Sequence, residues 1–207
     1  MSLYLPGLNA VFIHIPKTGG SWVKEVLSKS MKVEPAIGAG SHNLPWRYNH
    51  PGAKRFCFVR DPVTWLESVW MGLHSSWPHE GRGLDVPEML NDRAFSPIRL
   101  LTMRCGERDF DTFIDNVLEL EPGFVSRMYE WYIGPQGAPL VDFVGRMESI
   151  VADLSNALFH MGWDGDIEFT DPVNSCESAR PNWDGRLKND IISAERVGLQ
   201  RWYGSTG

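Results

Sequence analysis

The feature that most constrains this chain is a short apolar segment that ends in a proline and a glycine pair. Residues 10–15 are almost continuously apolar and rich in β-branched and aromatic side chains, which predicts a strand buried on both faces of a parallel sheet. Pro16 and the pair Gly19-Gly20 end this strand. The apolar positions that follow recur at helical spacing: Val23, Val26 and Leu27. We therefore predict a strand, a glycine-containing loop and a helix in direct succession.

A second unit of the same kind follows. Residues 55–59 read as a buried strand, and Asp61-Pro62 as a helix start with proline in the first turn. The apolar face of that helix is formed by Trp65, Leu66 and Val69. Two strand-to-helix units indicate an α/β fold, in which ligands bind at the carboxyl ends of the strands.

The rest of the chain continues the alternation. Apolar stripes predict helices over residues 110–118 and 150–158, and a closing helix over 191–197. Residues 140–144 read as a third strand. We expect a three-layer α/β/α sandwich around a mostly parallel sheet. No long linker divides the 207 residues, so we expect a single domain spanning residues 1–207.

The charge of the chain is unevenly distributed. Its 20 Lys and Arg stand against 26 Asp and Glu, a net charge of −6, which argues against a dedicated nucleic-acid binder. Residues 1–60, however, hold eight basic residues and two acids, Glu25 and Glu34, so this part carries +6 and the remainder −12. An acidic protein of this kind can still hold an anion in a locally positive region.

Cysteine and hydropathy patterns suggest a soluble, cytoplasmic protein. The three cysteines, Cys57, Cys105 and Cys176, stand far apart and form no Cys-x-x-Cys pair, so neither a zinc site nor a disulfide framework is indicated. No apolar run approaches the roughly 18 residues of a membrane span. The first basic residue is Lys17, which leaves no charged region for a signal peptide.

The loop over residues 16–22 carries the chemistry of an anion site. Consecutive backbone N–H groups that run into a helix N-terminus form a concave anion site, and glycines allow close approach. Thr18 and Ser21 add hydroxyl donors, and Lys17 adds a positive charge. The loop is not a Walker A motif, where Lys follows the last glycine and is itself followed by Ser or Thr. The alternative is a tight turn with an exposed lysine.

The second strand-to-helix turn offers further donors. Arg60 closes the second strand, and Ser68 lies two turns into the next helix. The planar guanidinium group suits phosphate, and a hydroxyl on the same side adds a donor. The alternative is local pairing of Arg60 with Asp61 at the helix start.

Together these motifs resemble those of the sulfotransferases that use 3′-phosphoadenosine 5′-phosphosulfate (PAPS). The loop of that family reads Pro-Lys-Ser/Thr-Gly-Gly/Thr-Thr/Ser, as do residues 16–21 here. Trp22 and Glu25 are similar to the cytosolic branch, whereas residues 14–20 look more like the branch of the carbohydrate 2-O-sulfotransferases. The eight-residue interval from Arg60 to Ser68 is also that of the family. Residues 144–148, followed by Asp153-Leu154, are similar to a later Val-Gly-Arg-x-Glu segment.

The resemblance implies a P-loop NTPase-like fold and a role for each matching residue. Gly19, Gly20 and Ser21 would bind the 5′-phosphate, and Lys17 the oxygen that bridges phosphate and sulfate. Trp22 would stack on adenine, unless it is an ordinary core residue. The 3′-phosphate would be bound by Arg60 and Ser68. PAPS would be the co-substrate, with 3′-phosphoadenosine 5′-phosphate (PAP) as product, and no metal is expected.

An acceptor hydroxyl or amine must lose a proton, and a histidine is the usual base. In the family the base often lies in a segment resembling His-x-x-Pro between the phosphate motifs. Residues 41–45 fit best, so His42 is the candidate base and His50 the second candidate. His14 lies on the predicted buried strand, which favours a structural role over a catalytic one.

The nucleotide site in the family is closed by a basic, glycine-containing loop near the C-terminus. Arg186 beside Gly185 is the candidate here, with Arg180, Lys188 or a solvated surface arginine as alternatives. The irregular stretch over residues 70–108 is expected to cover the acceptor, a small molecule or a carbohydrate. The competing functions are a nucleotide kinase or NTPase, and a noncatalytic PAP- or PAPS-binding module.

Overall fold

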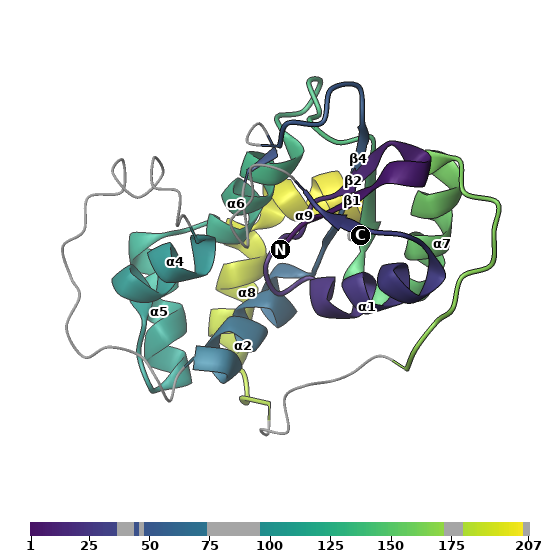
Figure 1. The fold of residues 1–207 in the computed structure, drawn as a ribbon. Coiled ribbons are helices and arrows are strands. Elements are labelled where there is room, and N and C mark those ends of the chain that lie inside the picture. Colours follow the sequence, from purple (N-terminus) through teal and green to yellow (C-terminus); the bar gives the residue numbers. More distant parts are fainter. Residues whose placement is uncertain (37–43, 46–47, 74–95, 172–179, 205–207) are drawn as a thin grey trace. The chain divides into compact units, whose positions relative to one another are not determined.

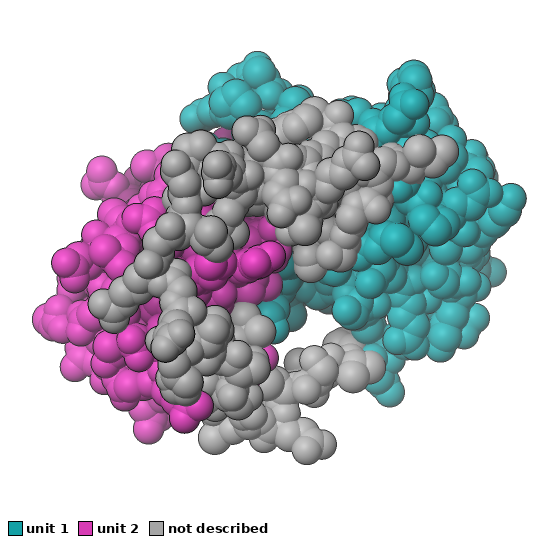
Figure 2. Space-filling model, turned by 60° about the vertical axis from the view of Figure 1, so that its left-hand side comes forward, with its two compact units in different colours: residues 1–60, 129–173 teal, residues 61–128, 174–207 magenta. Residues whose placement is uncertain are grey.

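The structure of the chain is a computed structural model. It describes residues 1–36, 44–45, 48–73, 96–171 and 180–204. The chain divides into two compact units, and each unit is built from two segments of the sequence (Figure 2). Unit 1 comprises residues 1–60 and 129–173, and unit 2 comprises residues 61–128 and 174–207. The single domain expected over residues 1–207 stays a prediction.

Unit 1 contains the sheet, which confirms the α/β class (Figure 1). The described strands are β1 (Leu3–Leu5), β2 (Ala10–Phe12), β3 (Glu34–Pro35), β4 (Lys54–Val59) and β5 (Phe143–Arg146). Their order in the sheet is β3-β1-β2-β4-β5. β2, β4 and β5 pair in parallel, whereas β1 is antiparallel to both β2 and β3. Four of these strands therefore run in one direction, and the sheet is mixed but mostly parallel.

The register brings the ends of three strands to one edge. Phe12 lies beside Phe56 in the β2/β4 pair, and Val59 beside Arg146 in the β4/β5 pair. The chain continues extended beyond β2, where the Ile13 N–H donates to the Phe56 carbonyl (2.8 Å). The loops that follow β2, β4 and β5 consequently leave the sheet from the same, carboxyl-terminal edge.

Helices α1 (Gly20–Ser30) and α7 (Ile150–Met161) share one hydrophobic core with the sheet. The strand residues in this core alternate along each strand, as the two-residue period of a strand requires: Leu3, Leu5, Ala10, Phe12, Phe56 and Phe58. Residues of the opposite face, including Val11, Cys57 and Val59, are also fully buried. Burial on both faces is what the continuous apolar runs predict.

Unit 2 is helical in its described residues. Its helices are α2 (Pro62–Leu73), α4 (Pro97–Cys105), α5 (Phe110–Leu120), α8 (Gly185–Ala194) and α9 (Arg196–Tyr203), and α6 (Phe124–Ile133) begins in unit 2 and continues into unit 1. Carboxylates cap α2, α5 and α8, because Asp61, Asp109 and Asp184 accept from backbone N–H groups of the first turn. The helix start expected at Asp61-Pro62 is thereby confirmed.

Several elements differ from the sequence expectation. The part of the stretch over residues 70–108 that contains α4 is helical rather than irregular, and residues 74–95 lie outside the described residues. The third strand runs over Phe143–Arg146, not 140–144. None of the helices in the described ranges is both long and apolar enough to cross a lipid bilayer. Cys57 and Cys105 are free and buried, and Cys176 is not among the described residues.

A fully buried carboxylate holds the start of α6. Glu195, at the junction of α8 and α9, accepts hydrogen bonds from the backbone N–H groups of Val125 (2.9 Å) and Ser126 (2.8 Å). The Ser126 hydroxyl adds a third bond at 2.5 Å. Burial raises the pKa of Glu195, while these hydrogen bonds oppose that rise. The carboxylate thus satisfies helix N–H groups that water does not reach.

Replacing Glu195 by alanine should destabilise the protein. The N–H groups of Val125 and Ser126 would lose their acceptor, and a buried unsatisfied donor costs about 1–3 kcal/mol. We expect Glu195→Ala to lower the free energy of unfolding by about 2 kcal/mol or more, measured by urea denaturation. The control is Glu119→Ala at an exposed position of α5, expected within about 0.5 kcal/mol of wild type. Equal effects of the two substitutions would contradict the role of Glu195.

Candidate anion-binding site

The two turns singled out from the sequence meet at one edge of the sheet in unit 1. The loop over residues 16–21 follows β2, and Arg60 follows the neighbouring parallel strand β4. An Arg60 Nη1–H donates to the backbone carbonyl of Lys17, with an N–O distance of 3.3 Å. Two segments 43 residues apart in sequence therefore form one local structure.

The backbone of the loop adopts left-handed conformations at two positions. Lys17 has φ +64° and Gly19 has φ +79°. Glycine adopts this conformation readily, but it is unusual for a residue with a Cβ. Alternation of left-handed residues with ordinary ones turns successive N–H groups toward the same side, and this arrangement forms anion-binding concavities. The loop is therefore more than a simple reverse turn.

Among the described residues, the N-terminus of α1 at this loop has no side-chain cap. Gly19 is the N-cap residue and provides no side-chain cap, and the first turn contains no acidic residue. The Val23 N–H donates to the Gly19 carbonyl, so the N–H groups of Gly20, Ser21 and Trp22 precede the first intrahelical bond. Ser21 is exposed beside them. Such an end attracts anions through the helix dipole and its N–H donors.

The hydroxyl of Thr18 is used inside the loop. Its Oγ1 donates to the Ile15 carbonyl (2.9 Å), and the residue is only 1% exposed. In this structure the hydroxyl stabilises the turn, and its expected role as a donor to phosphate stays a prediction. The backbone N–H of Thr18 is the group that it can offer to a ligand.

Both glycines are in close contact with neighbouring side chains. A Cβ on Gly19 would lie 2.5 Å from Ile150 Cδ1, and a Cβ on Gly20 would lie 1.9 Å from Cδ2 of His14. Neither distance is tolerated, so the loop packs directly on the start of α7 and on His14, which lies two residues beyond β2. The glycines are needed for this close approach as well as for backbone freedom.

The segment Val144–Glu148, noted for its resemblance to a family motif, supports the loop. Gly145 of β5 faces Phe58 and Asp153, each within 3.0 Å of where its Cβ would be. The Asp153 carboxylate accepts from the backbone N–H of Arg146 (2.6 Å) and from the Ser149 hydroxyl. These contacts fix the turn that brings α7 against Gly19.

His14 has a structural role in this arrangement. It is 8% exposed, its ring lies against Gly20, and its backbone N–H donates to Ser2 Oγ (2.9 Å). Ser2 Oγ is in turn 2.7 Å from the hydroxyl of Tyr48, whose pKa burial raises to about 12. This network favours the structural interpretation of His14 over a catalytic one.

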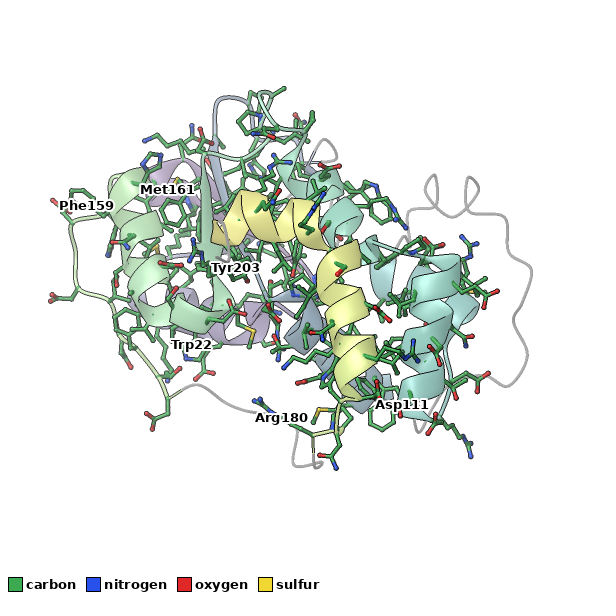
Figure 3. All side chains as sticks on the ribbon, turned by 180° about the vertical axis from the view of Figure 1, so that it is seen from behind. Trp22, Asp111, Phe159, Met161, Arg180 and Tyr203 are labelled. Carbon is green, nitrogen blue, oxygen red and sulfur yellow. The ribbon has the colours of Figure 1, made fainter. Side chains whose placement is uncertain are left out.

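Trp22 lies in the core rather than on an open surface. It belongs to the first turn of α1 (Figure 3) and is 6% exposed. Its ring stacks on Phe169 at a centroid distance of 6.1 Å and an interplanar angle of 8°. The indole N–H donates to the Thr170 carbonyl (2.9 Å). These contacts favour the alternative role of Trp22 as a core residue over stacking on adenine.

The backbone of Arg60 is fixed by one buried hydroxyl. Tyr129, fully buried on α6, accepts from the Arg60 N–H (2.9 Å) and donates to the Arg60 carbonyl (2.8 Å). No sequence pattern singled out Tyr129, because its importance depends on a contact 69 residues away in the chain. The position from which Arg60 reaches the loop is thus set by α6.

Two further candidates belong to unit 2. Ser68 is half-buried in α2. Arg186 is exposed in the first turn of α8, where it forms ion pairs with Asp190 (3.3 Å) and Asp115 (3.7 Å). This environment favours the alternative interpretation of Arg186, a solvated surface arginine, over a residue that closes the nucleotide site. Their proposed roles toward a nucleotide stay predictions, as do those of the exposed residues Arg180 and Lys188.

Of the two candidate bases, the structure describes only His50. His42, with His74 and His79, lies outside the described residues. The His50 ring stacks on Tyr4 at 4.0 Å, next to the contact of Asn9 with Gly52, at the amino-terminal end of β2. Residues 10–15 separate this end from the loop by roughly 20 Å, at about 3.3 Å per residue. His50, the second candidate base, therefore lies at the wrong edge of the sheet.

Among the side chains that the structure describes, no group of three or more His, Cys, Asp or Glu is arranged to hold a metal ion.

The packing of His14 on Gly20 gives a direct test of the loop. Gly20→Ala should destabilise the protein and distort the loop, because the added methyl overlaps the imidazole. In the double variant His14→Ala/Gly20→Ala the imidazole is gone and the overlap should be relieved. The double variant should therefore lose about 1 kcal/mol or more less in free energy of unfolding than the sum of the two single variants, as measured by urea denaturation. Gly7→Ala, with open space around the new Cβ, is the control. Additive effects of the two substitutions would show that this contact does not constrain the loop.

Comparison with known proteins assigns neither a family nor a function to the chain. No protein-family model, no curated protein and no solved structure matches the chain. The resemblance to PAPS-dependent sulfotransferases therefore rests on the sequence motifs alone.

Proposed function

We propose that the protein is a PAPS-dependent sulfotransferase acting on a hydroxyl or amine acceptor. The observation that carries the proposal is the contact of Arg60 with the Lys17 carbonyl. The two motifs that resemble the phosphate-binding segments of that family are 43 residues apart, and they meet at the carboxyl edge of parallel strands. Ligands of open α/β sheets bind at this edge.

The proposal includes a P-loop NTPase-like, three-layer sandwich. It is supported by the parallel strands β2, β4 and β5, by the loop between β2 and α1, and by burial of both faces of the sheet. Helices α1 and α7 contribute to one core with the sheet. In such a fold the loop after β2 occupies the place of a phosphate-binding loop.

In the proposed reaction the acceptor oxygen or nitrogen attacks the sulfur of PAPS in line with the leaving phosphate. The new bond to sulfur forms as the bond from sulfur to the bridging oxygen breaks, and PAP leaves with the electron pair. Lys17 would stabilise the negative charge that grows on the bridging oxygen. His42 would take the proton of the acceptor. Because a sulfuryl group carries less charge than a phosphoryl group, this chemistry does not call for a metal.

Backbone N–H groups at the loop and at the start of α1 would bind the 5′-phosphate, with Ser21 adding its hydroxyl. Arg60 and Ser68 are the residues proposed for the 3′-phosphate, and Arg186 for closing the site. We do not propose that adenine stacks on Trp22, because the Trp22 ring stacks on Phe169 and its indole N–H donates to the Thr170 carbonyl.

Nucleotide binding distinguishes the proposal from a kinase. We expect calorimetric titration to show that PAP binds without Mg²⁺, at least about tenfold more tightly than ATP or GTP. The loop differs from Walker A because Lys17 precedes the glycines, so Mg²⁺ should not strengthen binding of ATP. Mg²⁺-dependent ATP binding in the absence of PAP binding would refute the proposal.

Catalysis is tested by Lys17→Ala with labelled PAPS and a panel of phenols, amines and sugars as acceptors. Loss of a positive group at the leaving oxygen should lower the transfer rate roughly 100-fold or more. Lys29→Ala, at the other end of α1, is the control and should retain wild-type rates. If wild type binds PAP but transfers sulfate to no acceptor, including water, the protein is a noncatalytic binding module.

A further inference from the structure

We infer that Arg60 is a positioning residue for the loop that binds the 5′ end of the nucleotide, in addition to any contact with the 3′-phosphate. This inference rests on the proposed function and concerns the Lys17–Thr18 peptide. Arg60 binds the carbonyl side of that peptide at 3.3 Å. The hydrogen bond selects one orientation of a peptide in the loop itself.

The orientation of the carbonyl determines that of the neighbouring N–H. The described chain contains no cis peptide bond, and in a planar trans peptide the C=O and N–H point in opposite directions. With the Lys17 carbonyl directed at Arg60, the Thr18 N–H points away from the guanidinium group. Its hydroxyl is already bonded to Ile15, so this N–H is the donor that Thr18 can offer to an anion.

The loop needs such a restraint because Lys17 is held in an unfavourable conformation. Its φ of +64° is left-handed, which a residue with a Cβ adopts only when its surroundings impose it. Rotation of the Lys17–Thr18 peptide would break the bond from Arg60 to the Lys17 carbonyl and redirect the Thr18 N–H. A hydrogen bond from a charged guanidinium is stronger than one from a neutral donor and opposes this rotation.

Arg60 is itself held firmly enough to act as a restraint. The buried Tyr129 hydroxyl bonds both the N–H and the carbonyl of Arg60, at 2.9 and 2.8 Å. The hydrogen bonds thus run from α6 to the end of β4 and from there to the loop after β2. Every residue in this series belongs to unit 1.

The two possible roles of Arg60, positioning the loop and binding the 3′-phosphate, have different effects on a ligand that lacks a 3′-phosphate. An arginine that only contacts the 3′-phosphate has no effect on a ligand that lacks this group. An arginine that shapes the loop affects every ligand with a 5′-phosphate. Adenosine 5′-monophosphate (5′-AMP), which has no 3′-phosphate, is therefore the decisive probe.

The experiment compares Arg60→Met with Ser68→Ala by calorimetric titration of PAP and 5′-AMP. We expect Arg60→Met to weaken binding of both nucleotides, and that of 5′-AMP about tenfold. Ser68 is proposed to contact the 3′-phosphate alone. Ser68→Ala should therefore weaken binding of PAP and leave the affinity for 5′-AMP unchanged. If Arg60→Met weakens PAP but leaves 5′-AMP at its wild-type affinity, the inference is wrong. If wild type binds neither nucleotide, the proposed function fails instead.

A second pair of variants tests the support of Arg60 from α6. Tyr129→Phe keeps the ring but removes both bonds to the Arg60 backbone, and should also weaken 5′-AMP binding. Tyr132→Phe removes another fully buried hydroxyl from the same helix and is the matched control. Urea denaturation measures how much each variant loses in stability. An equal loss of 5′-AMP affinity in both variants would reduce the role of Tyr129 to general stability and overturn this step.

Discussion

The hydrogen bond between Arg60 and the Lys17 carbonyl depends on the parallel pairing of β2 and β4. Parallel neighbours end at the same edge, so the residues that follow them meet without a special turn. The crossover between these strands includes α1, and its N-terminus, which has no side-chain cap among the described residues, lies at the same edge as the loop. One pairing of strands thereby brings together a strained loop, a helix terminus and an arginine.

Close packing makes this edge rigid. Gly19 allows Ile150 to approach the loop, Gly20 allows His14 to approach it, and Gly145 leaves room for Phe58 and Asp153. These contacts come from residues as far apart in sequence as His14 and Asp153, and each would be disrupted if its glycine carried a Cβ. The loop owes its conformation to surrounding tertiary structure as much as to its own glycines. A preorganised donor set of this kind is what binding of a charged group in a fixed orientation requires.

Local patterns in the sequence were sufficient to predict the strand–loop–helix units, since period and turn residues are properties of neighbouring positions. They gave the loop after β2 and the helix start at Asp61, both confirmed. These local patterns do not predict contacts between segments that are distant in the sequence. Nothing local distinguishes Tyr129 as the partner of Arg60, or Phe169 as the cover of Trp22. The same limit applies to His50, whose position relative to the loop depends on which edge of the sheet it occupies.

The charge distribution has a structural counterpart in unit 1. The two acidic residues among the first 60, Glu25 and Glu34, form ion pairs with Lys29 at 3.4 Å and with Lys32 at 3.0 Å. Both pairs lie toward the carboxyl end of α1 and in the segment that follows it, whereas the loop is at the amino end, where the first turn contains no acid. The acids therefore reduce positive charge where the helix dipole is negative and leave it in place where the dipole is positive. The net charge of −6 is thus compatible with an anion site, because the field at a site depends on the nearest charges rather than on their sum.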